Sequence, residues 1–234
     1  VSGHVTVSTG GVSPGVNGMV SQVGGLIGYG NFTDGTVSIA RVGATGPLDV
    51  TALAGVDSLW SVVQIGQIGG LIGSRISVRS TAAIREAYSS GDVTVIAGDD
   101  AATEAGATYV GGLIGYSYAG DSVATLIGTY ASGNVSVTAT ADAGASYSAA
   151  SIYMVGGLVG GNYASTNGVN FGYAPQAVSS DASISGSRSS GVIRVVAKAS
   201  TTAEVGRVGG LIGENSAVVF TQSVSADAIG EVFT

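Results

Sequence analysis

The chain lacks cysteine altogether and has one histidine, one tryptophan and three prolines among its 234 residues. Without cysteine there can be no disulfide, no thiolate metal site and no cysteine nucleophile. A Ser-His-Asp triad and a histidine-based zinc site both need histidines, and His4 is the only one. We therefore expect a protein without catalytic residues or a cofactor.

Charge is also scarce, because Asp, Glu, Lys and Arg together make up only 10% of the residues and the net charge is −7. An acidic chain is a poor ligand for nucleic acid or for an anionic membrane. No apolar run approaches the roughly 18 residues that a transmembrane helix needs, so we expect no membrane insertion. The chain opens at Val1 without a signal-like segment, which suggests a processed or excised segment. Few lysines, no cysteine and many small residues fit an extracellular or cell-surface location.

Glycine, by contrast, is abundant, with 40 residues, well above the usual share of roughly 7%. The hexamer Val-Gly-Gly-Leu-Ile-Gly, with single conservative changes, begins at positions 23, 68, 110, 155 and 208. Its copies are thus 45, 42, 45 and 53 residues apart. Such spacing indicates an internal repeat, and we expect residues 1–234 to form a single repeat domain of five repeats of 42–53 residues.

A second pattern, Gly-x-aliphatic-x-aliphatic, follows each hexamer and predicts a strand. The clear copies are 91–95, 133–137 and 191–195, and 3–7 and 46–50 are looser. Apolar residues alternate with polar ones at a period of two, which is typical of a half-buried strand. Helix-forming residues are scarce, so we expect an all-β fold.

Glycine weakens a strand interior, so its repetition needs a physical reason. It can adopt a positive φ at a corner, or it can let two backbones approach closely. Both uses suit a β-solenoid in which equivalent residues of successive coils stack about 4.8 Å apart. The expected structural ladder is Gly24, Gly25, Leu26, Gly69, Gly70, Leu71, Gly111, Gly112, Leu113, Gly156, Gly157, Leu158, Gly209, Gly210 and Leu211.

The connection from the second pattern to the next hexamer is long. Residues 138–153 alternate out and back across a polar stretch, as do the runs near residues 99 and 201. Hairpin flaps extending from the coil explain this pattern, and so does one large coil.

The best copy, residues 110–137, joins the hexamer to the run Tyr-Ala-Ser-Gly-Asn-Val. It resembles the GLUG repeat of large secreted or surface-attached bacterial proteins, including filamentous adhesins. The resemblance covers most of the chain, although the first and last copies depart from the pattern after the hexamer. It implies a surface location and an extended β-structure, and it implies no catalytic residues.

Residues 3–7 and 230–234 both match the second pattern, so the chain opens and closes in the same phase. An uncapped solenoid end is an open sheet edge that can pair with another chain. Two origins fit: a segment cut from a longer array, or a subunit that stacks head to tail on other copies of itself.

Few side chains suggest a binding site. Asp99 and Asp100, with Glu104 nearby, are the candidate calcium ligands, although a solvated turn also explains them. Tyr88 and Tyr130 share one repeat phase and Tyr29 and Tyr116 share another. The other tyrosines fall in or near variable loops: Tyr109, Tyr118, Tyr147, Tyr153, Tyr163 and Tyr173. The candidate contacts for surface glycans or another filament are Tyr88, Tyr116, Tyr118 and Tyr130, with packing over the coil as the alternative.

Two glycosylation sequons, at Asn31 and Asn134, matter only if the host glycosylates. The leading hypothesis is a non-enzymatic extracellular structural protein, either an adhesin segment or a subunit of a self-assembling surface filament. The alternatives are a polysaccharide- or ice-binding module and a polysaccharide-active β-helix enzyme. The acidic residues recur at no fixed repeat phase beside a base, which argues against the enzyme.

Overall fold

The computed structural model describes residues 1–10, 18–54, 61–141, 147–167 and 180–220. All regular structure in these ranges is β-strand, which confirms the all-β prediction. The same ranges contain no helix with the length and apolar character needed to cross a membrane.

The strands form five parallel sheets, which the chain visits in the fixed order I to V before it returns to sheet I. We call one such passage a circuit. Sheet I contains β2 (Gly18–Val20), β8 (Val62–Gly69), β13 (Glu104–Gly111), β18 (Ala149–Gly156) and β23 (Thr202–Gly209), with β3 (Val23–Gly24) also paired to β8. Sheet II contains β4 (Ile27–Thr33), β9 (Ile72–Val78), β14 (Ile114–Gly120), β19 (Val159–Asn167) and β24 (Ile212–Phe220).

The other three sheets complete each circuit. Sheet III contains β5 (Thr36–Ala40), β10 (Thr81–Arg85), β15 (Val123–Ile127) and β20 (Asp181–Ser185). Sheet IV contains β6 (Gly43–Ala44), β11 (Tyr88–Ser89), β16 (Tyr130–Ala131) and β21 (Arg188–Ser189). Sheet V contains β1 (Val5–Gly10), β7 (Leu48–Leu53), β12 (Val93–Ala97), β17 (Val135–Ala141) and β22 (Ile193–Ala199).

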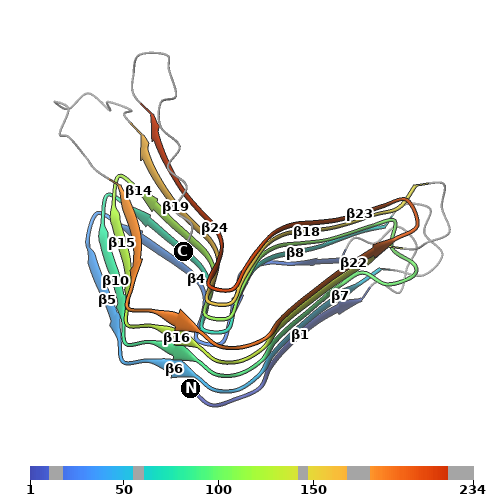
Figure 1. The fold of residues 1–234 in the computed structure, drawn as a ribbon, viewed down its shortest axis with the longest axis horizontal. Helices are drawn as coiled ribbons and strands as arrows, with labels where there is room; N and C mark the ends of the chain where they lie inside the picture. The colour runs from blue at the N-terminus through green and yellow to red at the C-terminus, as the bar shows by residue number, and fades with distance from the viewer. Residues whose placement is uncertain (11–17, 55–60, 142–146, 168–179, 221–234) are drawn as a thin grey trace.

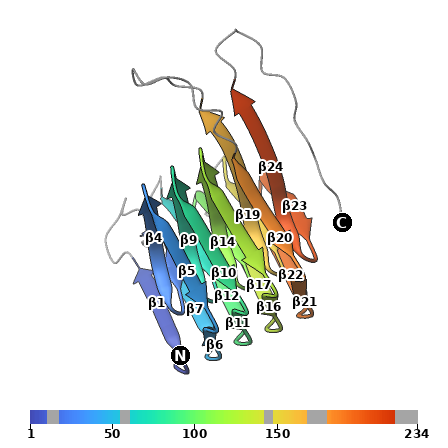
Figure 2. The same cartoon turned by 90° about the vertical axis from the view of Figure 1, so that its left-hand side faces the viewer.

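Successive circuits stack in register, as the side view in Figure 2 shows. The first residues of the five hexamers pair in one row, from Val23 through Ile68, Val110 and Val155 to Val208. The leucine of each of the first four hexamers donates its backbone N–H to the leucine carbonyl of the next circuit, at 2.8–3.0 Å. Leu71, Leu113 and Leu158 are fully buried in this row, whereas Leu26 at its end is 39% exposed.

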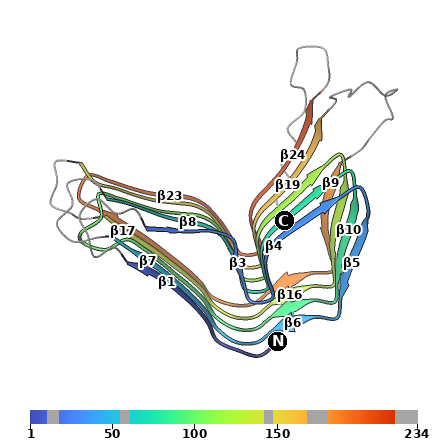
Figure 3. The same cartoon turned by 180° about the vertical axis from the view of Figure 1, so that it is seen from behind.

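In cross-section the circuit is a V, seen from the front in Figure 1 and from behind in Figure 3. Sheets I and V face each other in one arm, and sheets II and III face each other in the other. Sheet IV joins the arms at the base, and the hexamers turn the chain from sheet I into sheet II at the inner angle of the V.

Each arm has its own hydrophobic core, built from stacked columns of identical or similar residues. In the arm of sheets I and V a typical column is Val50, Val95 and Val137, with Val195 at its end. The core of the other arm holds the hexamer leucines together with Ile84 and Leu126 of sheet III. Burial of one such side chain contributes about 1.5–3 kcal/mol to folding.

The structure decides against hairpin flaps in the described residues. β17 and β18, which run out and back between the second pattern and the next hexamer, do not pair with each other. β17 pairs with β12 and β22 in sheet V, and β18 pairs with β13 and β23 in sheet I. The alternation predicted the strands correctly, but their backbone partners are the neighbouring circuits.

The hexamer glycines allow close backbone approach. A Cβ atom on Gly112 would lie 2.2 Å from the Gly157 carbonyl oxygen of the next circuit. A Cβ on Gly111 would lie 2.0 Å from the Ile114 carbonyl oxygen, across the sharp turn into sheet II. Real Cβ atoms essentially never come this near, so a side chain at either position requires the backbone to move.

Left-handed backbone occurs instead at Gln22, at Gly98 and at two corners of the circuit. Asp34, Arg79 and Asp121 adopt it between sheets II and III, and the second corner lies between sheets III and IV. Arg41, Glu86, Gly128 and Gly186 occupy this corner in four successive circuits, with φ of 54°, 52°, 60° and 57°. An L-residue with a side chain is strained in this region, whereas glycine is not. Two circuits thus carry the strain that the next two avoid.

We therefore expect Glu86→Gly to raise the free energy of unfolding by about 1 kcal/mol. The side chain of Glu86 is exposed, so its removal costs little packing. Urea unfolding of Glu86→Gly and of the control Glu86→Ala, which keeps the Cβ atom, measures the effect. Equal stability of the two variants would contradict the assignment of strain to this corner.

The arm of sheets II and III also buries a polar column, made of Gly30, Arg75, Ser117, Asn162 and Asn215. Arg75 is fully buried, and its Nη2 donates to Ser117 Oγ at 2.7 Å. Its Nη1 donates to the Thr125 carbonyl at 3.4 Å, and its Nε has no partner. Burial lowers the pKa of Arg75 to about 10.

Candidate functional site

Side chains from sheets I and II line the inside of the V. On sheet I one column that faces this side consists of Gln67, Tyr109, Met154 and Arg207. On sheet II the column nearest the hexamer turn consists of Tyr29, Ser74, Tyr116, Gly161 and Glu214. The next column that faces this side is Asn31, Ile76, Tyr118, Tyr163 and Ser216.

Four half-buried tyrosines meet where these columns converge, and we call them the inner tyrosine cluster: Tyr109, Tyr116, Tyr118 and Tyr163. The ring centroids of Tyr109 and Tyr116 are 4.8 Å apart, across the angle between the two sheets. Tyr163 lies 5.5 Å from Tyr116 and 6.0 Å from Tyr109, and Tyr118 stacks parallel to Tyr116 at 6.5 Å. The cluster therefore joins both arms of the V.

Gly161 makes room for two of these rings. It occupies the position equivalent to Tyr116 in the next circuit. A Cβ atom on Gly161 would lie 2.7 Å from the Tyr163 ring and 2.8 Å from the Tyr109 ring. Both rings therefore rest directly on the backbone of β19.

A polar network adjoins the cluster. The Tyr163 hydroxyl donates to Glu214 Oε2 at 2.6 Å, and Arg207 Nη1 donates to the same oxygen at 2.9 Å. Arg207 comes from sheet I and Glu214 from sheet II, so the ion pair also spans the inner angle. Burial raises the pKa of Tyr163, as do its hydrogen bonds to Glu214 and Tyr109. Burial, with the neighbouring phenols, raises the pKa of Tyr116 to about 12.

We expect Tyr116 and Tyr163 to stay protonated after an ordinary tyrosine, with a pKa of about 10, has ionised. A raised phenol pKa means that the unfolded chain loses its protons first, so stability falls as pH rises above about 10. Tyrosinate absorbance, measured against pH on the native and the urea-unfolded chain, tests this. Superimposable curves would contradict the burial of the cluster, and Tyr163→Phe should remove part of the late transition.

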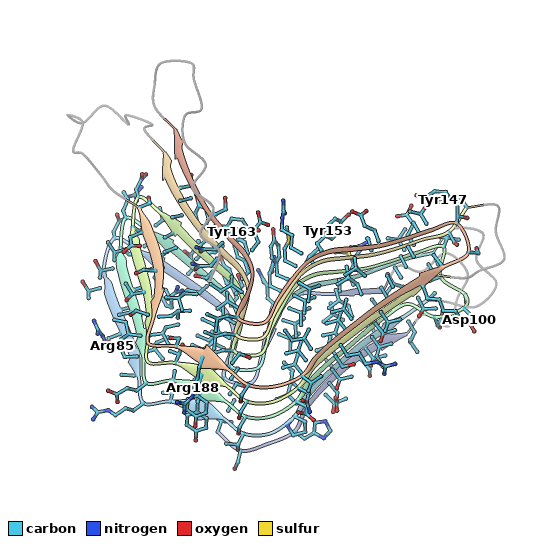
Figure 4. All side chains as sticks on the ribbon, viewed as in Figure 1. Arg85, Asp100, Tyr147, Tyr153, Tyr163 and Arg188 are labelled. Carbon is cyan, nitrogen blue, oxygen red and sulfur yellow. The ribbon has the colours of Figure 1, made fainter. Side chains whose placement is uncertain are left out.

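The structure separates the four tyrosines predicted from the sequence as surface contacts. Tyr116 and Tyr118 lie in the inner cluster. Tyr88 and Tyr130 lie on sheet IV, where their rings stack at 5.2 Å with Arg188 over Tyr130 at 5.3 Å. This stack is at the base of the V, as the position of Arg188 in Figure 4 shows.

Two members of the cluster were not among those candidates. The sequence predicts Tyr109 and Tyr163 in or near variable loops, but they lie on β13 and β19. The same prediction is wrong for Tyr118 and Tyr153, which lie on β14 and β18. Tyr173 lies outside the described residues. The sequence signal for Tyr109 was its place directly before a hexamer, which fixes it beside the inner angle. Tyr163 follows its hexamer at the same spacing as Tyr118, its in-register partner, so the repeat phase was the signal for it.

The candidate calcium ligands do not form a site. Glu104 begins β13, whereas Asp99 and Asp100 lie in the turn before it. Asp99 Oδ1 accepts the backbone N–H of Ala101 at 3.0 Å, as in a capped turn. Within the described ranges no three Asp, Glu, His or Cys residues are grouped closely enough to hold a metal ion.

The remaining candidates are exposed or partly exposed, and Asn31 among them lies in the column of Tyr118 inside the V. His4 Nε2 contacts Asp49 Oδ2 beside sheet V, and both side chains are partly exposed. The sequon residues Asn31 and Asn134 are exposed. Asn134 Oδ1 accepts the backbone N–H of Val192 at 3.0 Å in the next circuit.

Comparisons of the chain with protein-family models, curated proteins and solved structures find no match.

Proposed function

We propose that this chain is a non-enzymatic structural protein of the cell exterior. In this proposal the stacked circuits are a β-solenoid rod of the type that the GLUG-repeat resemblance implies. Further circuits lengthen the rod by stacking on its ends, and copies of the same chain supply them.

Two glycines carry this proposal: Gly210 and Gly3, each at the end of a column of equivalent glycines. Gly25, Gly70, Gly112 and Gly157 each face the carbonyl of the following circuit, where a Cβ atom would lie 2.1–2.5 Å from it. Gly210 is the last in this column, and a Cβ atom there would meet nothing within 4 Å. A further circuit stacked on this end would place a carbonyl against Gly210, as at the other four glycines of the column.

The opposite end shows the same arrangement. Gly46, Gly91, Gly133 and Gly191 each face the carbonyl of the preceding circuit, with Cβ distances of 1.7–2.0 Å. A Cβ atom on Gly3, the first of this column, would meet nothing within 4 Å. Both ends of the stack therefore keep a glycine whose counterparts in the other circuits face a carbonyl of the neighbouring circuit.

The outermost strands also favour stacking. Within the described residues β5 and β20 end sheet III and β1 and β22 end sheet V, each paired on one side only. The unpaired N–H and C=O groups of such edges are a template for another strand. A contact between unlike ends continues as a filament when its rotation does not close a ring.

Negative-stain electron microscopy of the purified chain tests the proposal. Wild-type protein should form fibres at high concentration, and Gly210→Val or Gly3→Val should shorten or abolish them. The control is Gly35→Val, because a Cβ atom at Gly35 has no neighbour closer than 3.8 Å. A wild-type monomer at all concentrations would contradict self-assembly and favour an adhesin segment whose own chain continues the circuits.

The outward column of sheet V does not favour ice binding. That function needs a regular threonine face, but the relevant outward column of sheet V is Thr6, Asp49, Thr94, Ser136 and Arg194.

A further inference from the structure

We propose that the inner tyrosine cluster binds a neutral polysaccharide chain that runs along the stacking axis, inside the V. This binding site goes beyond the structural role and does not depend on fibre formation.

The aromatic groups supply the apolar part of the site. Tyrosine combines a large apolar ring with a polar hydroxyl, which suits a ligand that has apolar C–H faces and many hydroxyls. The four rings of the cluster are half-buried, so each is held by packing and still presents surface. Because side-chain rotation is already restricted, binding costs little further entropy.

The polar groups around the rings are uncharged or paired. Gln67 on β8 is the in-register neighbour of Tyr109, and its amide can donate and accept hydrogen bonds. Arg207 and Glu214 form an ion pair with each other, so the site carries no unpaired charge from them. These groups match a hydroxyl-rich neutral ligand better than an acidic or a basic one.

Two further tyrosines extend the site beyond the cluster. Tyr29, two circuits before Tyr116 in the same column, is 46% exposed. Tyr153, on β18 in the same circuit as Tyr163, is 43% exposed. Figure 4 shows Tyr163 and Tyr153 on the two arms, both directed toward the space between them. Tyrosines thus lie beside the inner angle in the circuits of the hexamers at 23, 110 and 155, with Gln67 and Ser74 in the circuit between the first two. A row of this length suits a polymer rather than a single sugar.

A peptide fits less well. A peptide usually binds a sheet by adding a strand to a free edge. β13 and β14 carry the centre of the cluster, and each is paired on both sides, so no free edge exists there.

The repeat columns provide substitutions that the fold already contains. Tyr116→Ser places at 116 the residue found at Ser74, and Tyr109→Gln places at 109 the residue found at Gln67. Tyr147→Ser is the control. Tyr147 is 46% exposed and lies at the tip of the arm of sheets I and V, away from the inner angle (Figure 4). Affinity electrophoresis is run through gels containing hydroxyethyl cellulose, galactomannan, dextran or, as the acidic comparison, alginate.

We expect at least one neutral polymer to retard the wild-type chain. The double variant Tyr109→Gln/Tyr116→Ser should bind about tenfold more weakly or worse, and Tyr147→Ser should bind like wild type. Binding should persist in Gly210→Val, which separates this test from that of assembly. No retardation by any neutral polymer, retention only by alginate, or equal binding of the double variant would overturn the proposal.

A measurement on the unaltered chain covers the case in which the double variant does not fold. Nitration of tyrosines by tetranitromethane, mapped by mass spectrometry, should be suppressed at Tyr116 and Tyr118 by the retarding polymer. Nitration of Tyr147 should not change. Equal nitration with and without the polymer would overturn the proposal.

Discussion

Gly112→Ala is expected to destabilise the folded chain by at least about 3 kcal/mol. The added Cβ atom would lie 2.2 Å from the Gly157 carbonyl oxygen and 3.0 Å from the Ala131 Cβ atom. Both neighbours belong to packed ladders, so relief requires that two circuits separate locally and lengthen their hydrogen bonds. Domains are commonly stable by only about 5–15 kcal/mol, so the loss is a large fraction of the total.

The matched control is Gly210→Ala, which makes the same change at the same place in the last hexamer. No atom lies within 4 Å of the added Cβ there, so the expected change is within about 0.5 kcal/mol. Urea unfolding at low protein concentration, followed by circular dichroism, measures both variants as monomers. Equal losses at the two positions would show that close stacking is not the reason for glycine in the hexamer.

Arg75→Met is expected to stabilise the chain, by about 1–3 kcal/mol at neutral pH. Arg75 is fully buried, its Nε has no partner, and its two hydrogen bonds go to the uncharged groups of Ser117 and Thr125. Methionine has a similar length without the cost of burying a charge. Arg75→Lys, which keeps a buried charge, should be no more stable than wild type.

The gain from Arg75→Met should depend on pH. Burial lowers the pKa of Arg75 to about 10 in the folded chain, below its ordinary value of 12.5. The cost of the buried charge is therefore fully present below pH 10 and disappears as pH rises from about 10 toward 12.5. The stability difference between Arg75→Met and wild type, measured at several pH values, should shrink over that interval. A variant less stable than wild type at neutral pH would contradict this account of Arg75.

The stacking of the hexamers could be predicted from the sequence, because their glycines and leucines recur at nearly constant spacing. In the structure this stacking places Val110 beside Val155 and Leu113 beside Leu158. The alternating valines predicted sheet V in the same way. From the sequence, the hexamer glycines could serve either to adopt a positive φ at a corner or to let two backbones approach closely. The structure shows close approach.

The V shape and the inner cluster could not be predicted, because they depend on how one circuit folds back on itself. The alternation of residues 138–153 is the same for a hairpin and for two facing parallel sheets. Tyr109 and Tyr116 lie on opposite sides of a hexamer, and only the turn angle brings their rings to 4.8 Å. Arg75 lies in a strand among polar residues, which gives no sign that its guanidinium is buried.

The most direct test of the account is a disulfide between neighbouring circuits. Thr94 and Ser136 face outward on sheet V and are in-register partners, 42 residues apart in the chain. Because the protein has no cysteine, Thr94→Cys/Ser136→Cys introduces one possible pair. In-register stacking predicts rapid intramolecular cross-linking on mild oxidation. The control Thr94→Cys/Thr140→Cys, displaced by about 13 Å along the strand, should not cross-link. Failure of the first pair, or equal cross-linking of both, would contradict the stacked register on which the fold and both proposals depend.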